Sequence, residues 1–209
     1  MRRGSDPLAP DLRAFRQEIR AQHPPFIRAV LADARLTAAC RAERFEFRSP
    51  LDAAVQALRL MWVSDAFLAQ VCYRAKARMQ ALGVPIAPRL AHRLAMAIAQ
   101  ICIGDPVVVR PGVYIAHGQV VIGGITTVET GVVIFPWVTL GLRSGNSKGP
   151  TIGPRVTIGS GAKVIGPVTV GAGANIGANA VVVDDVAAGT TVAGAPARPL
   201  HRAPQADDG

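Results

Sequence analysis

The sequence predicts two parts, an α-helical half followed by a parallel β-helix, and three observations support this fold class. Apolar residues in the first half recur at the three-to-four-residue spacing of amphipathic helices. In the second half an aliphatic residue recurs at every sixth position, and glycine often follows it. Aromatic residues make up only 5% of the chain, so Val, Ile, Leu and Ala must fill the core. We therefore expect a helical domain over 1–102, a β-helix domain over 103–195 and a C-terminal tail over 196–209.

Start and stop signals divide the first half into several helices. Ser49, Pro50 and Asp52 are typical of an N-cap, a first helical position and a first turn. Gly83 is placed to end the helix that begins at Asp65. These signals predict helices over 11–22, 26–44, from Pro50 onward, over 65–82 and from 88 toward 99.

The net charge of +9 is concentrated in this helical half. Residues 1–102 hold sixteen Lys and Arg against eight Asp and Glu, whereas the rest of the chain holds seven against six. Such an excess attracts acidic partners, but solvated helix faces in an Arg-rich protein also explain it. No run of five basic residues and no interleaved aromatic residue is present, so we favour solvated faces and expect no nucleic acid partner. We expect His23 and His92 to be structural or solvated.

Several signals favour a soluble protein of the cytoplasm. There is no uncharged apolar run of about 18 residues, and the N-terminus lacks the hydrophobic region of a signal peptide, so we expect no contact with a membrane. Cys40, Cys72 and Cys102 are odd in number and lack the spacing of metal ligands. We therefore expect buried, reduced thiols and no metal site.

A six-residue repeat dominates the second half. The recurring aliphatic residues are Ile103, Val109, Ile115, Ile122, Val128, Ile134, Leu140, Ile152, Ile158, Val164, Val170, Ile176 and Val182. A strand does not require this period, and a helix does not tolerate so much glycine and valine. The repeat is typical of a parallel β-helix, in which each hexad forms one face of a triangular coil. Stacked coils then bury columns of aliphatic side chains.

The repeat is irregular at two places. Ile115 and Ile122 are seven residues apart, so one residue is inserted near His117. A coil accommodates an extra residue by bulging outward, and we therefore expect His117 at the coil surface. The second irregularity is the polar, Gly-rich segment 141–150, which we expect to form a loop or a loosened coil side beside the histidine.

Several motifs in this half resemble a known family. They are AHGQVVIGG (116–124), VTLGL (138–142), PTIG (150–153), IGSGAKVIGP (158–167), IGANAVVVDDV (176–186) and VAGAPAR (192–198). Together they resemble the hexapeptide-repeat acyltransferases, in particular the serine O-acetyltransferase branch. The helical segment 67–90 is also similar to helices that precede the β-helix in that branch. The resemblance covers about Pro50 to Arg198.

The resemblance implies a left-handed parallel β-helix that assembles as a homotrimer or a dimer of trimers, with active sites between neighbouring β-helices. It implies acetyl-CoA as cosubstrate, His117 as general base on an acceptor hydroxyl, and a backbone oxyanion site for which Gly141 is the candidate. The candidates for acceptor binding are Gln119, Trp137, Arg143, Asn146 and Lys148. The candidates for CoA binding are Ser160, Gly161, Ala162, Lys163, Ala178 and Arg198, although coil geometry alone also explains Gly161, Ala162 and Ala178.

The sequence departs from this branch where the acceptor is recognised. Ala116 and Cys102 stand where the branch carries aspartates, and 147–149 reads Ser-Lys-Gly where the branch carries Asp-Arg-His. We therefore expect acetyl transfer to a hydroxyl of a small amino-acid-like acceptor. Transfer to a hydroxyl or amine of a sugar or specialised metabolite is an alternative, and a non-catalytic trimeric scaffold is another.

Overall fold

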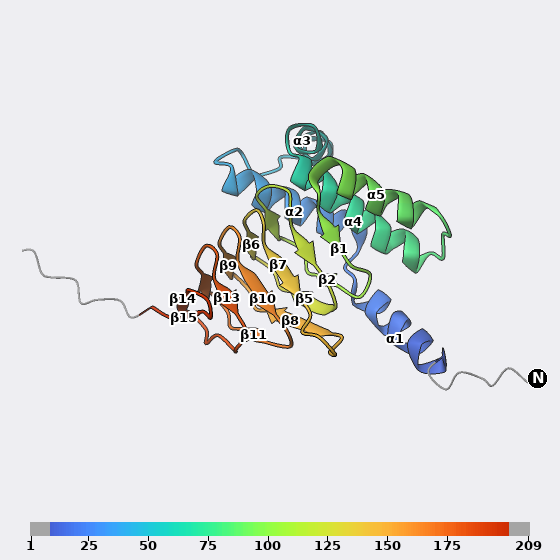
Figure 1. Cartoon of the computed structure of the whole chain (residues 1–209). Helices are drawn as coiled ribbons and strands as arrows, with labels where there is room; N and C mark the ends of the chain where they lie inside the picture. The colour runs from blue at the N-terminus through green and yellow to red at the C-terminus, as the bar shows by residue number, and fades with distance from the viewer. Residues whose placement is uncertain (1–8, 201–209) are drawn as a thin grey trace, which may run out of the picture.

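The computed structural model describes residues 9–200, in which five helices cover one end of a β-helix (Figure 1). The helices are α1 (Ala9–Gln22), α2 (Phe26–Cys40), α3 (Pro50–Val63), α4 (Asp65–Ala81) and α5 (Ala87–Ala99). The first eight residues of the expected helical domain and residues 201–209 of the expected tail lie outside the described part. Within the described part, no helix combines the length and apolarity needed to span a membrane.

The helix signals read from the sequence are confirmed with one correction. Ser49 caps α3, because its hydroxyl accepts a hydrogen bond from the Asp52 N–H at 3.1 Å, and Ser64 caps α4 in the same way. The prediction of one helix over 26–44 is wrong, because α2 ends at Cys40. Ala42 adopts the left-handed conformation there, and the Glu43 N–H donates to the Ala38 carbonyl as in a Schellman cap.

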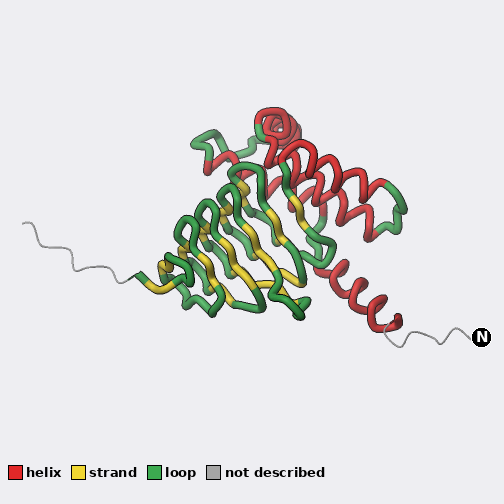
Figure 2. The backbone as a smooth tube through the Cα atoms, viewed as in Figure 1, coloured by secondary structure: helices red, strands yellow, loops and turns green. Residues whose placement is uncertain are grey.

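The second half is a parallel β-helix with three sheets, seen as stacked coils in Figure 2. Sheet A contains β1 (Cys102–Ile103), β4 (Val121–Ile122), β7 (Thr139–Gly141), β10 (Lys163–Ile165) and β13 (Val181–Val182). Sheet B contains β2 (Val108–Val109), β5 (Ile125–Val128), β8 (Lys148–Ile152) and β11 (Thr169–Val170). Sheet C contains β3 (Tyr114–Ile115), β6 (Val133–Ile134), β9 (Thr157–Ile158), β12 (Asn175–Ile176), β14 (Thr191–Ala193) and β15 (Arg198–Pro199). The last strand is antiparallel, so the chain folds back onto sheet C after the final coil.

The sixfold columns predicted from the sequence are confirmed. Every one of the thirteen aliphatic positions named above is at most 3% exposed. Residues 18 apart pair between neighbouring coils, as Val121 does with Thr139, so three hexads make one coil. The columns therefore stack sheet by sheet along the inside of the triangle.

Both irregularities of the repeat are visible in the pairing register. The first coil is one residue longer, since Cys102 pairs with Val121, 19 positions later. The third coil is six residues longer, since Thr139 pairs with Lys163, 24 positions later, and the extra residues form the loop 142–147. This loop leaves the corner between sheets A and B, whereas His117 lies at the corner between sheets C and A. The expectation of a loop is confirmed. The expectation that it lies beside His117 is wrong for a single chain, because the two lie at different corners.

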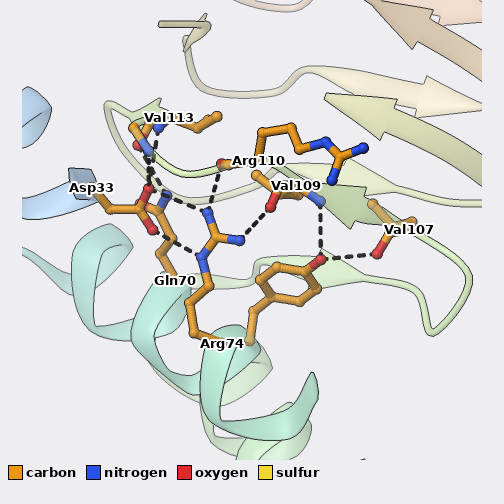
Figure 3. Close-up of polar contacts among 9 residues, drawn as sticks. Asp33, Gln70, Arg74, Val107, Val109, Arg110 and Val113 are labelled. Atoms are coloured by element: carbon orange, nitrogen blue, oxygen red, sulfur yellow. Dashed lines mark hydrogen bonds and ion pairs between the residues drawn. The ribbon is translucent and has the colours of Figure 1, made fainter. Parts of the chain in front are cut away.

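A polar face of α4 covers the open edge of the first coil (Figure 3). The buried ion pair of Arg74 with Asp33 of α2 joins the two helices at this edge, with Arg74 Nε 2.9 Å from Asp33 Oδ2. Arg74 also donates to the Val109 and Arg110 carbonyls, and Asp33 Oδ1 accepts from the N–H groups of Gly112 and the residue that follows it. These side chains satisfy backbone groups that would otherwise be unpaired, as any buried coil edge requires.

Three more residues of α4 extend this polar face. The Gln70 amide donates to the Val113 carbonyl at 2.9 Å, and the Tyr73 hydroxyl both donates to the Val107 carbonyl and accepts from the Val109 N–H. Lys76 Nζ donates to the Ile103 carbonyl at 2.6 Å. The interpretation of basic residues in this half as solvated faces is therefore wrong for Arg74 and Lys76, which are each 3% exposed.

The helices and the coils share one apolar cluster. Ala66 and Ala69 of α4 and Ala95 and Ala99 of α5 belong to the same buried cluster as the aliphatic columns. The three cysteines are free, as expected, but only Cys72 is buried, while Cys40 is exposed and Cys102 is half-buried. An exposed apolar stripe follows the outer face of α3, formed by Leu51, Val55, Leu58 and Trp62.

Candidate active site

His117 is held at a bulge between β3 and β4. The N–H of Ala116 donates to the Ile134 carbonyl, after which the chain leaves the sheet, and Val120 returns to the buried column. Within the bulge, the Gln119 N–H donates to the Ala99 carbonyl at 3.0 Å. That carbonyl is one of the last four of α5, which have no partner inside the helix. The inserted residue thus joins the end of α5 to the coil and leaves the His117 side chain exposed.

Gly118 fixes the position of this bulge. A Cβ atom built on Gly118 would lie 1.9 Å from the Ala99 carbonyl oxygen, so no larger residue fits without a backbone shift. Gln119 has a φ of +59°, in the left-handed region, which turns the chain back toward sheet A. The two residues after His117 therefore determine how the imidazole is presented.

A cavity of about 530 Å³ opens beside His117. Its floor is the coil corner, from which Gln119 and Trp137 join His117. The start of α4 and the end of α5 form the other walls. Two charged residues, Arg41 and Asp65, also line it, and neither was predicted to belong to the site. An acidic residue in the first turn of a helix and an arginine directly after a helix are both common, so no sequence signal indicated that Asp65 and Arg41 belong to the site.

The corner that holds His117 continues down the β-helix as a stack of tight turns. Gln119, Trp137, Gly161 and Asn179 occupy equivalent places in four successive coils, and all four have positive φ. The Gly161 N–H donates to the Pro136 carbonyl at 2.9 Å, which ties neighbouring turns together. The CoA candidates Ser160, Gly161, Ala162, Lys163 and Ala178 all lie at this corner or directly after it. The structure therefore brings the catalytic candidate and these cofactor candidates to a single edge.

Two basic candidates lie along the same edge. Lys163 begins β10, and its ammonium donates to the Trp137 carbonyl in the coil above. Arg198 lies in β15 at the last coil and forms an exposed ion pair with Asp184 at 3.3 Å.

The remaining candidates lie at the other corner of the same sheet. Gly141 ends β7, and its carbonyl accepts from the Gly166 N–H at 2.9 Å. In the loop that follows, the Asn146 side-chain oxygen accepts from the Lys148 N–H at 2.8 Å, so this amide shapes the loop itself. Arg143 and Lys148 are exposed. Within one chain, these four residues do not join the His117 cavity.

Comparison with known proteins agrees with the fold. The family model "Bacterial transferase hexapeptide (six repeats)" matches residues 149–184. No curated protein matches at the level of sequence.

Solved structures of serine acetyltransferases are similar over most of the chain. The enzyme from Vibrio cholerae O1 biovar El Tor N16961 is 30% identical, with 95% of this chain and 74% of that chain covered and a TM-score of 0.71. The Brucella abortus strain S19 enzyme in complex with coenzyme A is 26% identical, with 92% and 74% covered and a TM-score of 0.71. The soybean enzyme complexed with serine is 28% identical, with 90% and 73% covered and a TM-score of 0.71.

The fold and the matches together define a left-handed β-helix protein with an N-terminal helical segment. The chain belongs to the hexapeptide-repeat acyltransferases and is similar to their serine acetyltransferase branch. Among the described residues, no group of three or more His, Cys, Asp or Glu side chains is arranged to hold a metal ion.

Proposed function

We propose that this protein transfers an acetyl group from acetyl-CoA to a hydroxyl of a small amino-acid-like acceptor, with His117 as general base. The observation that carries the proposal is the shared edge, where His117 precedes a run of small residues and two basic side chains. Small residues leave room for the pantetheine arm of CoA, and Lys163 and Arg198 attract the phosphates of CoA. The similarity to an enzyme solved with coenzyme A supports the same assignment.

The transfer needs no covalent enzyme intermediate. The imidazole of His117 takes the proton of the acceptor hydroxyl while that oxygen attacks the thioester carbonyl. The resulting tetrahedral oxyanion is stabilised by backbone N–H groups, for which Gly141 is our candidate. When the intermediate collapses, the carbon–sulfur bond breaks, and the leaving thiolate takes the proton from the imidazolium. Histidine suits both steps because it accepts and returns protons near neutral pH.

The charges in the cavity support an amino-acid-like acceptor. Arg41 and Asp65 line it together with His117. An α-amino acid carries a carboxylate and an ammonium, which a guanidinium and a carboxylate can bind as two oppositely charged contacts. Arg41 Nε is engaged by Glu43 at 2.9 Å, which leaves its two terminal nitrogens as donors. These two residues would thus replace the recognition groups that are missing at 147–149.

We propose that the active site is completed by a second copy in a homotrimer. Gly141, Arg143, Asn146 and Lys148 lie at the corner between sheets A and B, whereas His117 lies at the corner between sheets C and A. Threefold packing of triangular coils places unlike corners of neighbours together, so the loop of one copy would meet the cavity of the next. The exposed stripe on α3 favours a further pairing of trimers. Size-exclusion chromatography with light scattering measures the molar mass and so distinguishes a trimer from a dimer of trimers.

The acceptor is tested by thiol release from acetyl-CoA with L-serine and two truncated analogues. Ethanolamine lacks the carboxylate, and 3-hydroxypropanoate lacks the ammonium. We expect release with L-serine, a higher KM for serine in Arg41→Ala and Asp65→Asn, and loss of most release with either analogue. As a matched control, Arg78→Ala on the exposed surface of α4 keeps the wild-type KM.

A different acceptor remains the specific alternative, because Ala116, Cys102 and 147–149 lack the polar groups of the branch. Release with a sugar or an amine, but not with L-serine or either analogue, would identify that alternative. A scaffold without catalysis predicts no release with any acceptor and no effect of His117→Ala beyond solubility.

A further inference from the structure

A second cavity lies at the other end of α5 and takes no part in the proposed transfer. Its volume is about 980 Å³, and it lies between α1, the hairpin of α4 and α5, and the turn after β1. Among the described residues, its lining and that of the His117 cavity have none in common. Its size is that of a small-molecule binding site.

Basic side chains outnumber acidic ones in the lining of this cavity. Arg20 of α1, Lys76 of α4, and Arg89 and Arg93 of α5 line it together with one carboxylate, Asp105. The negative charge of that carboxylate is balanced by Lys76, because Asp105 Oδ1 is 3.0 Å from Lys76 Nζ. Among the side chains that the structure describes, which leave out 9–13 and 16, none forms an ion pair with any of the three arginines. The cavity therefore has a positive charge that is not balanced from within.

Two imidazoles, those of His23 and His92, also line the cavity. Burial lowers the pKa of His23 to about 4, and the positive charges of Arg74, Lys76 and Arg110 add to this effect. Burial and Lys76 also lower the pKa of His92. The Nδ1 atom of His23 is buried and has no hydrogen-bond partner in the described part of the chain. Neutral imidazoles beside the arginines add polar atoms without adding charge.

Apolar side chains make up another part of the lining. Phe15 and Ile19 of α1, Val84 and Pro85 of the α4–α5 turn, and Pro106 after β1 contribute to it. Pockets for organic ligands combine apolar walls with a few convergent polar groups in this way, whereas a bare inorganic ion would leave the walls uncovered. The ligand that fits both features has anionic groups on an apolar body.

We propose that this cavity binds a small organic anion that carries phosphate or carboxylate groups on an apolar body. Arg89 and Arg93 are one helical turn apart on α5, and Arg20 approaches from α1, so three guanidinium groups bind the anionic end. The apolar part packs on Phe15 and Ile19. The site is separate from the proposed transfer and does not depend on it.

Calorimetric titration of the full-length protein tests this site. The probes are phenyl phosphate, phthalate and, as a neutral control, benzyl alcohol. Each is titrated in about 0.1 M salt, because the arginines are exposed and more salt would screen their charge. We expect at least one anionic probe to bind and the neutral probe not to bind. Binding of phenyl phosphate alone assigns a phosphate ligand, and binding of phthalate alone assigns a carboxylate ligand.

Variants place the probe in the cavity. We expect Arg89→Ala/Arg93→Ala to weaken binding at least about tenfold, while Arg78→Ala leaves it unchanged. Lys163→Ala also leaves it unchanged, which separates this site from the proposed CoA edge. Both arginines are exposed on a helix, and alanine favours helix, so the double variant keeps its melting temperature. If its melting temperature is lower than that of the wild type, the Arg89→Gln and Arg93→Gln variants are used in its place. Failure of both anions to bind the wild type, or equal binding by the arginine variants, would overturn the proposal.

Discussion

Replacement of Asp33 by alanine tests whether the helices hold the open end of the β-helix. Asp33 is 1% exposed, and both of its carboxylate oxygens accept from the Arg74 guanidinium, at 2.9 and 3.2 Å. Oδ1 also accepts from the N–H groups of Gly112 and Val113 at 2.8 and 3.1 Å. The Asp33→Ala variant therefore loses an ion pair and leaves two coil N–H groups without a partner.

The expected loss follows from these contacts. Removal of one partner from a buried ion pair costs about 3–5 kcal/mol, because the other charge remains buried. Each unsatisfied buried N–H costs about 1–3 kcal/mol, but these terms overlap because water entering the vacated space solvates all three groups. We therefore expect the free energy of unfolding to fall by about 4 kcal/mol. A typical domain has only about 5–15 kcal/mol of stability, so this is a large fraction.

Urea unfolding at a fixed protomer concentration measures the change, since assembly contributes to apparent stability. With a slope of about 2–3 kcal/mol per molar urea, a loss of about 4 kcal/mol lowers the midpoint by about 1.3–2 M. Asp184→Ala is the control, because it removes one partner of an exposed ion pair, which is worth at most about 1 kcal/mol. Equal midpoint shifts for the two variants would refute the capping role of Asp33.

Three further predictions concern single residues. Gly118→Ala places a methyl group against the Ala99 carbonyl and displaces His117, so we expect kcat/KM to fall at least about tenfold. Gly123→Ala is the control, because a Cβ atom at Gly123 would have no neighbour within 4 Å, and this variant should retain activity. Lys163→Ala removes a charge from the edge, so it should raise the KM for acetyl-CoA while kcat changes little, and a fall in kcat alone would contradict that role. The folded-state pKa of His23, about 4, lies below its ordinary value of 6.5, so unfolding takes up a proton between these values, and stability falls as the pH drops from about 6.5 to 4. After discounting for partial exposure, this loss is about 1–2 kcal/mol, and His23→Gln should reduce the pH slope of the urea midpoint.

The architecture of the second half could be predicted from the sequence because its period is set by geometry. A coil has three faces of six residues each, so an aliphatic residue must recur at every sixth position to fill the interior. All thirteen predicted positions are buried. The frame slip likewise predicted an exposed His117. The helix cap at Ser49 was predictable because a hydroxyl at that place satisfies a specific N–H.

Other features depend on contacts that no local pattern reports. The loop 142–147 was placed beside His117 although it leaves another corner; counting hexads in threes from Ile122 would have separated the two. Arg74 and Lys76 read as solvated because a helical period does not reveal that a polar face meets the backbone edge of a coil. Arg41 and Asp65 reach the cavity only through tertiary packing of the helices on the coil.

The most direct test of the central proposal is the rate of acetyl-CoA-dependent thiol release in wild type and His117→Ala, with CoA affinity measured in parallel. If His117 is the general base, the variant loses about two to four orders of magnitude in turnover and keeps its affinity for CoA. Turnover within about tenfold of wild type, at unchanged CoA affinity, would contradict the proposal that this histidine moves the proton.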